Sequence, residues 1–468
     1  MNTESTILTE IEEYMKRESL SISKFAERCG LHSGTLSNII NSNRPIAMQQ
    51  LDRITEAMGL DTGFYYDLYI DNYIVNGSAN WRRIGPLLLR CAELQKLEAL
   101  ERVVGTILDN LVYLPLLFDT AEELFTKNMY AAAAIIYKSV AEAERLQHSE
   151  RLALCRYRLF HIAIGDSQAA NLHAANQFEP YIERLEEADQ LDAIKTLTDV
   201  FSSLRLWDKV EAWAMLLVRK AKAQYQYFQS HSVGEKQPSR PLVYYVLYGY
   251  LMQAAVSDER EDYEQALGYT RMYSNVQWVK PPLSEGEAKV IAQFEDWALA
   301  NTYLYRMMSG DIEVIPDYVA YLQQQEHEIF PALYKIMQAA NRFHFDVDPI
   351  LELFRDHLTY REQHSTLGKF TESLTKDRFA RFQSELAIYY LRKAEWNAGF
   401  HYLLESLTSS IRIMSDTNIT LGIGLFEKYR MYALPEHIER YHHCINKELN
   451  EQKYKDLLYC LLPQDSIS

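Results

Sequence analysis

Residues 22–60 read ISKFAERCGLHSGTLSNIINSNRPIAMQQLDRITEAMGL, and this stretch decides the fold of the N-terminal part of the chain. The pattern predicts a helix, a short break, a second helix, a loop and a third helix. Ser23 is placed to cap the first helix, because a hydroxyl just outside a helix accepts a hydrogen bond from an unpaired backbone N–H. Phe25, Ala26 and Cys29 then lie on one helical face. Gly30 ends the helix, since glycine adopts a left-handed conformation at little cost.

The second helix is predicted to begin near His32, with Leu36, Ile39 and Ile40 as its apolar stripe. Its outward side is then small and polar. Such a helix is able to approach the major groove of DNA closely and to offer short donors and acceptors to base edges. The loop adds Arg44, and the third helix adds Gln49, Gln50 and Arg53, all of which are able to reach phosphates. The predicted DNA-binding residues are Ser33, Gly34, Thr35, Ser37, Asn38, Arg44 and Gln49.

The segment resembles the helix-turn-helix of phage-repressor-type domains. The resemblance rests on A-x-x-x-G-L at 26–31, T-L-S-N-I-I-N at 35–41 and R-P at 44–45, and it covers roughly residues 5–68. It implies an N-terminal DNA-binding domain over residues 1–68. Acidic residues outnumber basic ones within residues 1–60, and affinity for DNA comes mostly from neutralising phosphates. One copy should therefore bind weakly, which favours a dimer on a palindromic operator.

The whole chain has the composition of a globular protein. It has 468 residues, 48% of them hydrophobic and 24% charged, and a net charge of −16, which excludes a protein that coats nucleic acid in general. Its five cysteines form no C-x-x-C pair and are expected to be reduced, as in the cytoplasm. No signal pattern and no apolar run of about 18–20 residues is present, so we expect no membrane contact. With 17 Gly and 13 Pro, the chain leaves room for long helices, and an all-α fold is predicted.

From about residue 80 a pattern recurs in which a polar corner carries a large apolar residue, and a small residue follows three positions later. The clearest corners lie near residues 130, 167, 207, 263, 312 and 396, with weaker ones near Leu97, Phe345 and Tyr432. The corners resemble those of tetratricopeptide repeats, whose reference motif is G-D-Y-x-x-A. The resemblance implies a right-handed α-solenoid of degenerate repeats over residues 69–468. An irregular helical bundle is the alternative.

A repressor-type helix-turn-helix joined to such an array resembles the peptide-responsive regulators of Gram-positive bacteria, the RRNPP group. The resemblance implies a cytoplasmic homodimer that binds a DNA operator. Its repeat groove would bind a short signalling peptide, and the peptide would change the curl of the solenoid and the spacing of the two DNA-binding heads.

Members of this group hold the peptide main chain with side-chain amides, which donate to C=O and accept from N–H. Carried over by position in the repeats, Asn301 is the best match, and arginines at groove-facing positions would bind a carboxylate. The predicted peptide-binding residues are Asn301, Tyr334, Gln338, Asn341, Arg156 and Arg381.

No residue pattern in the chain indicates an enzyme, a cofactor or a metal site. Gly234 and Lys236 lack the rest of a phosphate-binding loop, and the histidines at 437, 442 and 443 do not share a helical face and are expected to be solvated. Asp346 and Asp348 begin like a calcium loop that Pro349 breaks. Two other functions stay open: a protein-interaction adaptor that sequesters a folded partner, and a dimeric repressor without a ligand.

Overall fold

The computed structural model describes residues 6–41, 46–77, 80–147, 149–165, 167–230, 236–360, 372–413 and 415–449. In these residues the chain forms α-helices α1 to α23, with short 3-10 and π segments and no strand. The predicted all-α fold is confirmed. No helix in these ranges combines the length and the apolar character that a bilayer crossing requires.

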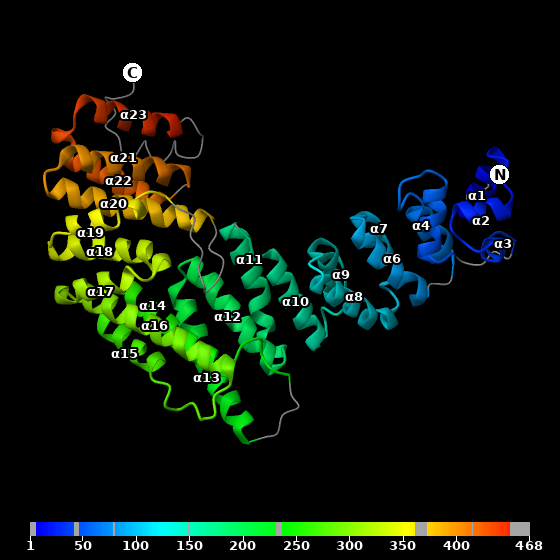
Figure 1. Cartoon of the computed structure of the whole chain (residues 1–468), viewed down its shortest axis with the longest axis horizontal. Helices are drawn as coiled ribbons and strands as arrows, with labels where there is room; N and C mark the ends of the chain where they lie inside the picture. Colours follow the sequence, from blue (N-terminus) through cyan, green and yellow to red (C-terminus); the bar gives the residue numbers. More distant parts are fainter. Residues whose placement is uncertain are drawn as a thin grey trace. The chain divides into compact units, whose positions relative to one another are not determined.

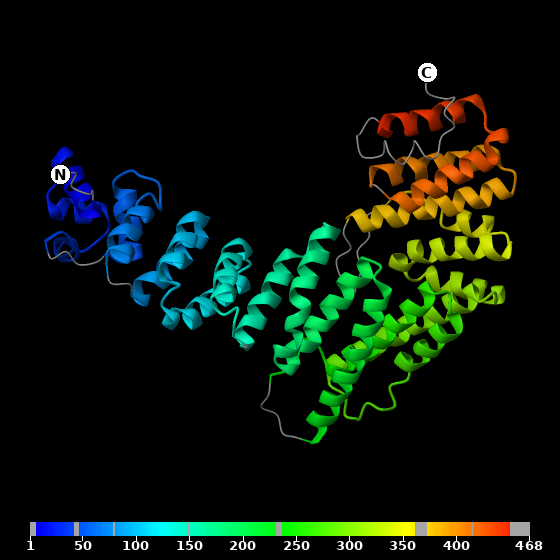
Figure 2. The same cartoon turned by 180° about the vertical axis from the view of Figure 1, so that it is seen from behind.

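The chain divides into two compact units, each described by itself. Unit 1 comprises Met1–Ile164 with Ala169–Gln190, and unit 2 comprises Gly165–Gln168 with Leu191–Ser468. Within each unit, consecutive helices lie side by side in chain order (Figures 1 and 2). The predicted boundary at residue 68 lies inside unit 1, where one hydrophobic core runs from Ile7 to Cys155.

The first unit contains eleven helices and three short segments among its described residues, with Gln168 of α11 the one residue assigned to unit 2. They are α1 (Ile7–Arg17), α2 (Ile22–Arg28), α3 (Ser33–Asn41), α4 (Met48–Ala57), α5 (Tyr66–Ile70), the π segment η1 (Asp71–Val75), α6 (Trp81–Glu93), α7 (Leu97–Ile107), η2 (Leu111–Tyr113), α8 (Leu114–Thr126), α9 (Tyr130–Ala143), α10 (Glu150–Ala163), α11 (Gln168–Phe178) and η3 (Glu179–Arg184).

Helix α12 (Glu187–Ser203) begins in unit 1 and continues in unit 2. The second unit then contains α13 (Trp207–Ser230), α14 (Leu242–Glu259), α15 (Tyr263–Ser274), α16 (Glu285–Met308), η4 (Ile312–Val314), α17 (Ile315–Leu322), η5 (Glu326–Glu328), α18 (Ile329–Phe343), α19 (Asp348–Leu353), η6 (Arg355–His357), α20 (Glu372–Arg392), α21 (Trp396–Arg412), α22 (Asp416–Tyr429), η7 (Arg430–Tyr432) and α23 (Pro435–Leu449).

The turns at six of the predicted corners share one backbone geometry. A residue in the left-handed conformation stands two positions before the next helix, and the N–H that follows it donates to the carbonyl five residues earlier. This is the Schellman arrangement, which satisfies carbonyls that the end of a helix leaves open. The left-handed residues are Gln95, Asn128, Arg205, Glu261, Gly310 and Ala394. The corner near residue 167 includes Asp166, which lies outside the described residues, and the corners near Phe345 and Tyr432 do not show this geometry.

Small residues just after these turns let two helices approach closely. Ala133 and Ala266 are fully buried at the fourth position of α9 and α15. At the same position of α21, a Cβ on Gly399 would lie 2.7 Å from the side chain of Leu391 and 3.0 Å from its backbone nitrogen. The small residue predicted three positions after a corner therefore has a packing role at these sites.

Polar contacts tie the first four helices to the helices that follow. The carboxylate of Asp52 on α4 accepts from the Tyr66 hydroxyl at 2.8 Å and from Nε of Arg90 on α6 at 2.7 Å. The hydroxyl of Tyr69 donates to the carbonyl of Ile46 at 2.8 Å. Helix α4 is thus fixed against α5 and α6 by buried and half-buried hydrogen bonds.

Candidate functional site

The first candidate site lies on helices α2 and α3, and the turn between them is tightly defined. Gly30 is left-handed, with φ of +63°, and the N–H of Leu31 donates to the carbonyl of Ala26 at 2.8 Å. The prediction that Ser23 caps α2 is wrong. Ser21 is the N-cap: it has extended backbone angles and its hydroxyl accepts from the N–H of Lys24 at 3.4 Å. The helix therefore starts two residues earlier than predicted and contains Ser23.

Helix α3 turns a polar side outward, as predicted. Leu36 and Ile39 are buried in the core of unit 1. The ring nitrogen Nδ1 of His32 accepts from the N–H of Gly34 at 3.2 Å and so satisfies one of the open donors at the start of the helix. Of the predicted DNA-binding residues on α3, Ser33, Gly34 and Asn38 are exposed, while Thr35 and Ser37 are half-buried.

The remaining predicted contacts of this site lie after α3. Gln49 is exposed in the first turn of α4, whereas Arg44 lies outside the described residues. Arg53 of α4 donates from Nη1 to the carbonyl of Gly30 at 3.1 Å, so it supports the turn between α2 and α3. Sequence reasoning assigns Arg53 only a phosphate contact, because the proximity of α4 to this turn depends on tertiary packing.

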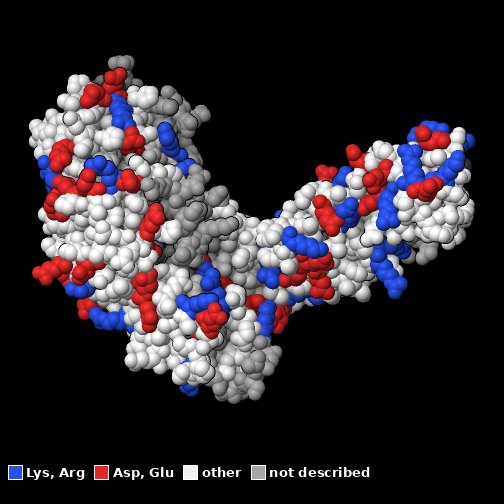
Figure 3. All heavy atoms as spheres, in the orientation of Figure 1, with Lys and Arg blue, Asp and Glu red and all other residues white. Residues whose placement is uncertain are grey.

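The helices before and after α3 in the chain, α2 and α4, carry basic side chains that form no ion pair among the described residues. Lys24, Arg28 and Arg53 are exposed, and none of them pairs with an acid among the described residues. On the face drawn in Figure 3, acidic and basic side chains are mixed along the chain, including over the N-terminal helices. On this face, phosphate-binding capacity at the N-terminal helices therefore comes from individual basic side chains that lie among acidic ones.

The second candidate site lies between α18 and α20 of unit 2. Tyr334, Gln338 and Asn341 are spaced four and three residues apart, so they share one face of α18. Nε2 of Gln338 donates to the hydroxyl of Tyr334 at 3.0 Å. Nδ2 of Asn341 donates to Glu385 on α20, to the carbonyl at 2.9 Å and to Oε2 at 2.8 Å.

On the facing side of α20, Arg381 donates from Nε to the carboxylate of Asp377 at 2.8 Å and also hydrogen-bonds Tyr334. Asp377 accepts two further hydrogen bonds from Ser415 and Asn418, at 3.0 and 3.1 Å. Four of the six predicted peptide-binding residues are thus brought together: Tyr334, Gln338, Asn341 and Arg381.

The other two predicted residues lie elsewhere. Nδ2 of Asn301 on α16 donates to the hydroxyl of Tyr273 on α15 at 2.8 Å, so this amide links two helices. Arg156 lies on α10 in unit 1, where its guanidinium lies 5.7 Å from the ring centroid of Tyr181. Its buried Nε has no hydrogen-bond partner in the part of the chain that the structure describes. Position within a repeat identifies neither partner, because both come from a neighbouring element.

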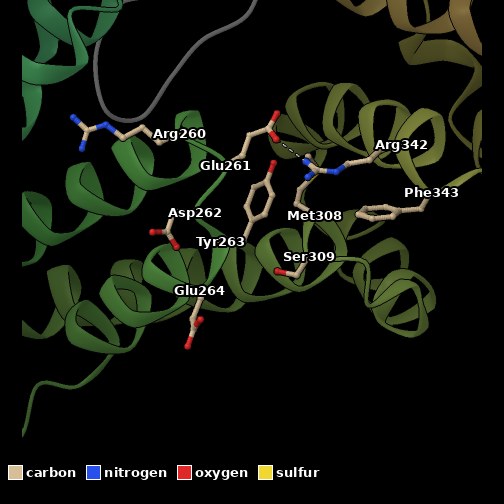
Figure 4. Close-up of a pocket in the computed structure, with 9 residues that line it drawn as sticks. All are labelled: Arg260, Glu261, Asp262, Tyr263, Glu264, Met308, Ser309, Arg342 and Phe343. Carbon is tan, nitrogen blue, oxygen red and sulfur yellow. Dashed lines mark hydrogen bonds and ion pairs between the residues drawn. The ribbon is translucent and has the colours of Figure 1, made fainter.

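Unit 2 contains a pocket that the sequence analysis does not predict. It is an open cavity of about 440 Å³ at the ends of α14, α16 and α18 (Figure 4). Arg342 pairs with Glu261 across one side at 2.9 Å, and the rings of Tyr263 and Phe343 line the wall. None of the predicted peptide-binding residues lines it. The remaining lining residues are Arg260, Asp262, Glu264, Met308 and Ser309.

Comparison with known proteins leaves the site to be interpreted on its own chemistry. No protein-family model matches the chain, and no curated protein shows significant similarity to it.

Proposed function

We propose that the chain is a cytoplasmic transcription regulator that binds a DNA operator as a homodimer and is switched by a short signalling peptide. In this proposal, α1 to α5 form a helix-turn-helix domain. The helices from α6 onward form a right-handed solenoid of tetratricopeptide-like repeats, with the peptide bound on the α18–α20 face. The protein acts through binding, without enzymatic chemistry and without a cofactor.

The observation that carries the proposal is the outer face of α3. Two buried residues, Leu36 and Ile39, fix the helix on the core, while Ser33, Gly34 and Asn38 are exposed on the other side. Small side chains permit close approach to the major groove, and the Asn38 amide is able to pair with adenine through two hydrogen bonds. Lys24, Arg28 and Arg53 are exposed and form no ion pair among the described residues, and they would contact phosphates.

The α18–α20 face supports the peptide-binding part of the proposal. The side-chain amides of Gln338 and Asn341 and the hydroxyl of Tyr334 are half-buried and adjacent on one helix. Amides of this kind are able to hydrogen-bond both groups of a peptide unit. The few cations around α3 predict weak binding by one copy, so two copies on a palindrome are proposed.

The test is fluorescence anisotropy of the full chain on DNA taken from just upstream of its own gene, with and without short synthetic peptides from the C-termini of neighbouring small open reading frames. We expect saturable binding that one peptide shifts. Binding that no peptide alters would support the ligand-free repressor, and no binding at moderate salt would support the adaptor.

A matched pair of variants locates the DNA contact. Asn38→Ala should weaken operator binding about tenfold or more, since a bidentate base contact contributes about 1–3 kcal/mol. Asn397→Ala, which alters another exposed asparagine, on α21, should leave operator binding unchanged. Equal affinities for both variants would show that α3 does not read the operator.

A further inference from the structure

The side chain of Arg53 links helix α4 to the turn between α2 and α3. Its Nη1 donates to the carbonyl of Gly30 at 3.1 Å, although the two residues are 23 positions apart in the chain. No backbone N–H among the described residues donates to this carbonyl. The hydrogen bond from Arg53 therefore restrains the peptide unit between Gly30 and Leu31, just before α3 begins at Ser33.

The backbone that carries Arg53 is firmly held. Leu51 and Ile54 on the same helix are fully buried in the core of unit 1. Asp52, which lies between them, accepts hydrogen bonds from side chains of α5 and α6. The contact with Gly30 therefore ties the turn to a packed helix.

The guanidinium of Arg53 keeps most of its donors for a ligand. Its N–H groups form a fixed planar fork, and only Nη1 is hydrogen-bonded within the described part of the chain. The side chain is exposed and forms no ion pair with any described residue. Such a fork is able to bind a phosphate through two parallel hydrogen bonds.

The turn is also the place where a backbone phosphate is expected. In helix-turn-helix docking, the first helix crosses the DNA backbone and the N-terminal residues of the second helix contact base edges. Gly30 lies between these two helices, so a donor at its carbonyl stands at the border of backbone and groove. Lys24 and Arg28 of α2 are exposed as well, but neither side chain is hydrogen-bonded to the turn in the described ranges.

We infer that Arg53 is a positioning residue that couples a phosphate contact to the direction of α3. One N–H of its guanidinium holds the Gly30 carbonyl, and the remaining donors bind a backbone phosphate at the same time. The single planar group thus sets α3 relative to the DNA backbone. The inference rests on the proposed DNA binding. It assigns Arg53 a part in sequence discrimination, whereas Lys24 and Arg28 contribute to affinity alone.

The test is fluorescence anisotropy of the full chain on two DNA duplexes of equal length. One comes from just upstream of its own gene, and the other contains the same bases in shuffled order. Each is titrated over a series of salt concentrations. The ratio of the two affinities reports the reading of bases, and the slope of log affinity against log salt reports the number of phosphates contacted.

Arg53→Gln should lower the affinity ratio about tenfold, because a charged hydrogen bond is lost, and should reduce the salt slope by about one per bound copy. Arg53→Lys keeps the charge and should keep the slope. Its ammonium lacks the planar fork, so the ratio should still fall. Lys24→Gln is the control, and it should reduce the slope and weaken both duplexes equally, with the ratio unchanged.

Each departure from this pattern has its own meaning. An unchanged ratio in Arg53→Gln, or in Arg53→Lys, would overturn the inference, since Arg53 would then act by its charge alone. A lower ratio with an unchanged slope in Arg53→Gln would overturn it as well, because Arg53 would only hold the turn.

The wild type separates this inference from the function on which it rests. If the wild-type chain binds both duplexes equally or binds neither, sequence-specific DNA binding itself is wrong, and the role of Arg53 falls with it. A variant that still binds the shuffled duplex has a folded DNA-binding domain, so a lower ratio in that variant is not caused by unfolding.

Discussion

His437 of α23 is packed against an aromatic ring. The sequence predicts that this residue belongs to a solvated histidine cluster, and this prediction is wrong. The ring of His437 stacks on Phe400 with centroids 5.0 Å apart, and its Nδ1 accepts from the N–H of Leu434 at 3.2 Å. Burial lowers the pKa of His437 from 6.5, and Arg440 lowers it further, while Glu436 raises it. The neutral ring is the form that the fold requires, because a protonated Nδ1 has no lone pair to accept with.

Stability should therefore depend on the titration of His437. The unfolded chain takes up the proton first as pH falls, so the contribution is present above pH 6.5 and is lost as pH falls from there to the folded pKa. The melting temperature of the wild type relative to His437→Gln should thus be higher at pH 7.5 than at pH 5.5. The exposed His443, changed to Gln, is the control and should give equal differences at both pH values. Equal differences for His437→Gln would refute the argument.

Predictions for single residues from the sequence are most accurate where helical periodicity alone determines which side chains are buried. The outer face of α3 follows from the positions of Leu36 and Ile39, and both are fully buried. It is poorest where a partner comes from another element. Asn301 fits its place in the repeat, yet its amide is bound to Tyr273 of the preceding helix. Glu385 shows no signal in the sequence until Asn341 is known to face it.

At the scale of the element, the Schellman turns carry a conformational cost at non-glycine residues. Ala394 is exposed and left-handed, with φ of +62°. A residue with a Cβ costs about 1–2 kcal/mol in the left-handed conformation, and a glycine substitution removes this cost. The greater flexibility of glycine in the unfolded chain offsets part of the resulting gain in stability. Ala394→Gly should therefore raise the free energy of unfolding by about 0.5–1 kcal/mol in urea titrations.

The control for this change is Ala131→Gly in the exposed first turn of α9. It should lower the free energy of unfolding or leave it unchanged, because glycine is a poor helix former. If Ala394→Gly also lowers the free energy of unfolding, the left-handed residue is not strained. The sequence predicts where these corners lie. It cannot predict that Gln95, Arg205 and Glu261 are left-handed, since the backbone there is set by the helices on both sides.

The packing of helices at the corners should be sensitive to the volume of the side chain three positions after the corner. Gly399→Ala places a methyl group 2.7 Å from the Leu391 side chain and 3.0 Å from its backbone nitrogen, so Leu391 or the helix must move. We expect a loss of about 1–3 kcal/mol in the free energy of unfolding. Gly424→Ala in α22 meets no atom within 4 Å and should stabilise by up to about 1 kcal/mol. Similar effects of the two variants in urea titration would contradict the packing argument.

On the scale of the whole molecule, local patterns set the helical content and the corners, whereas the division into units depends on long-range packing. The predicted boundary at residue 68 follows from the end of the helix-turn-helix resemblance. The hydrophobic core passes this point without interruption and continues to Cys155. Any signal that reaches α3 through the chain must therefore pass through unit 1 as a packed body, and not through a flexible linker.

The link between α4 and α6 tests that view. Asp52 accepts from both Tyr66 and Arg90, and its side chain is only 15% exposed, so removing Arg90 leaves a half-buried carboxylate without its cation. Arg90→Gln should speed amide exchange in both α4 and α6, by about five- to tenfold, because both helices lose one shared contact. Arg145→Gln, which breaks an exposed ion pair with Glu142 just after the C-terminal end of α9, should speed exchange in neither. Faster exchange in α6 alone would mean that α4 is held by its apolar contacts, and the proposed regulator would then need another route for a signal from the α18–α20 face to α3.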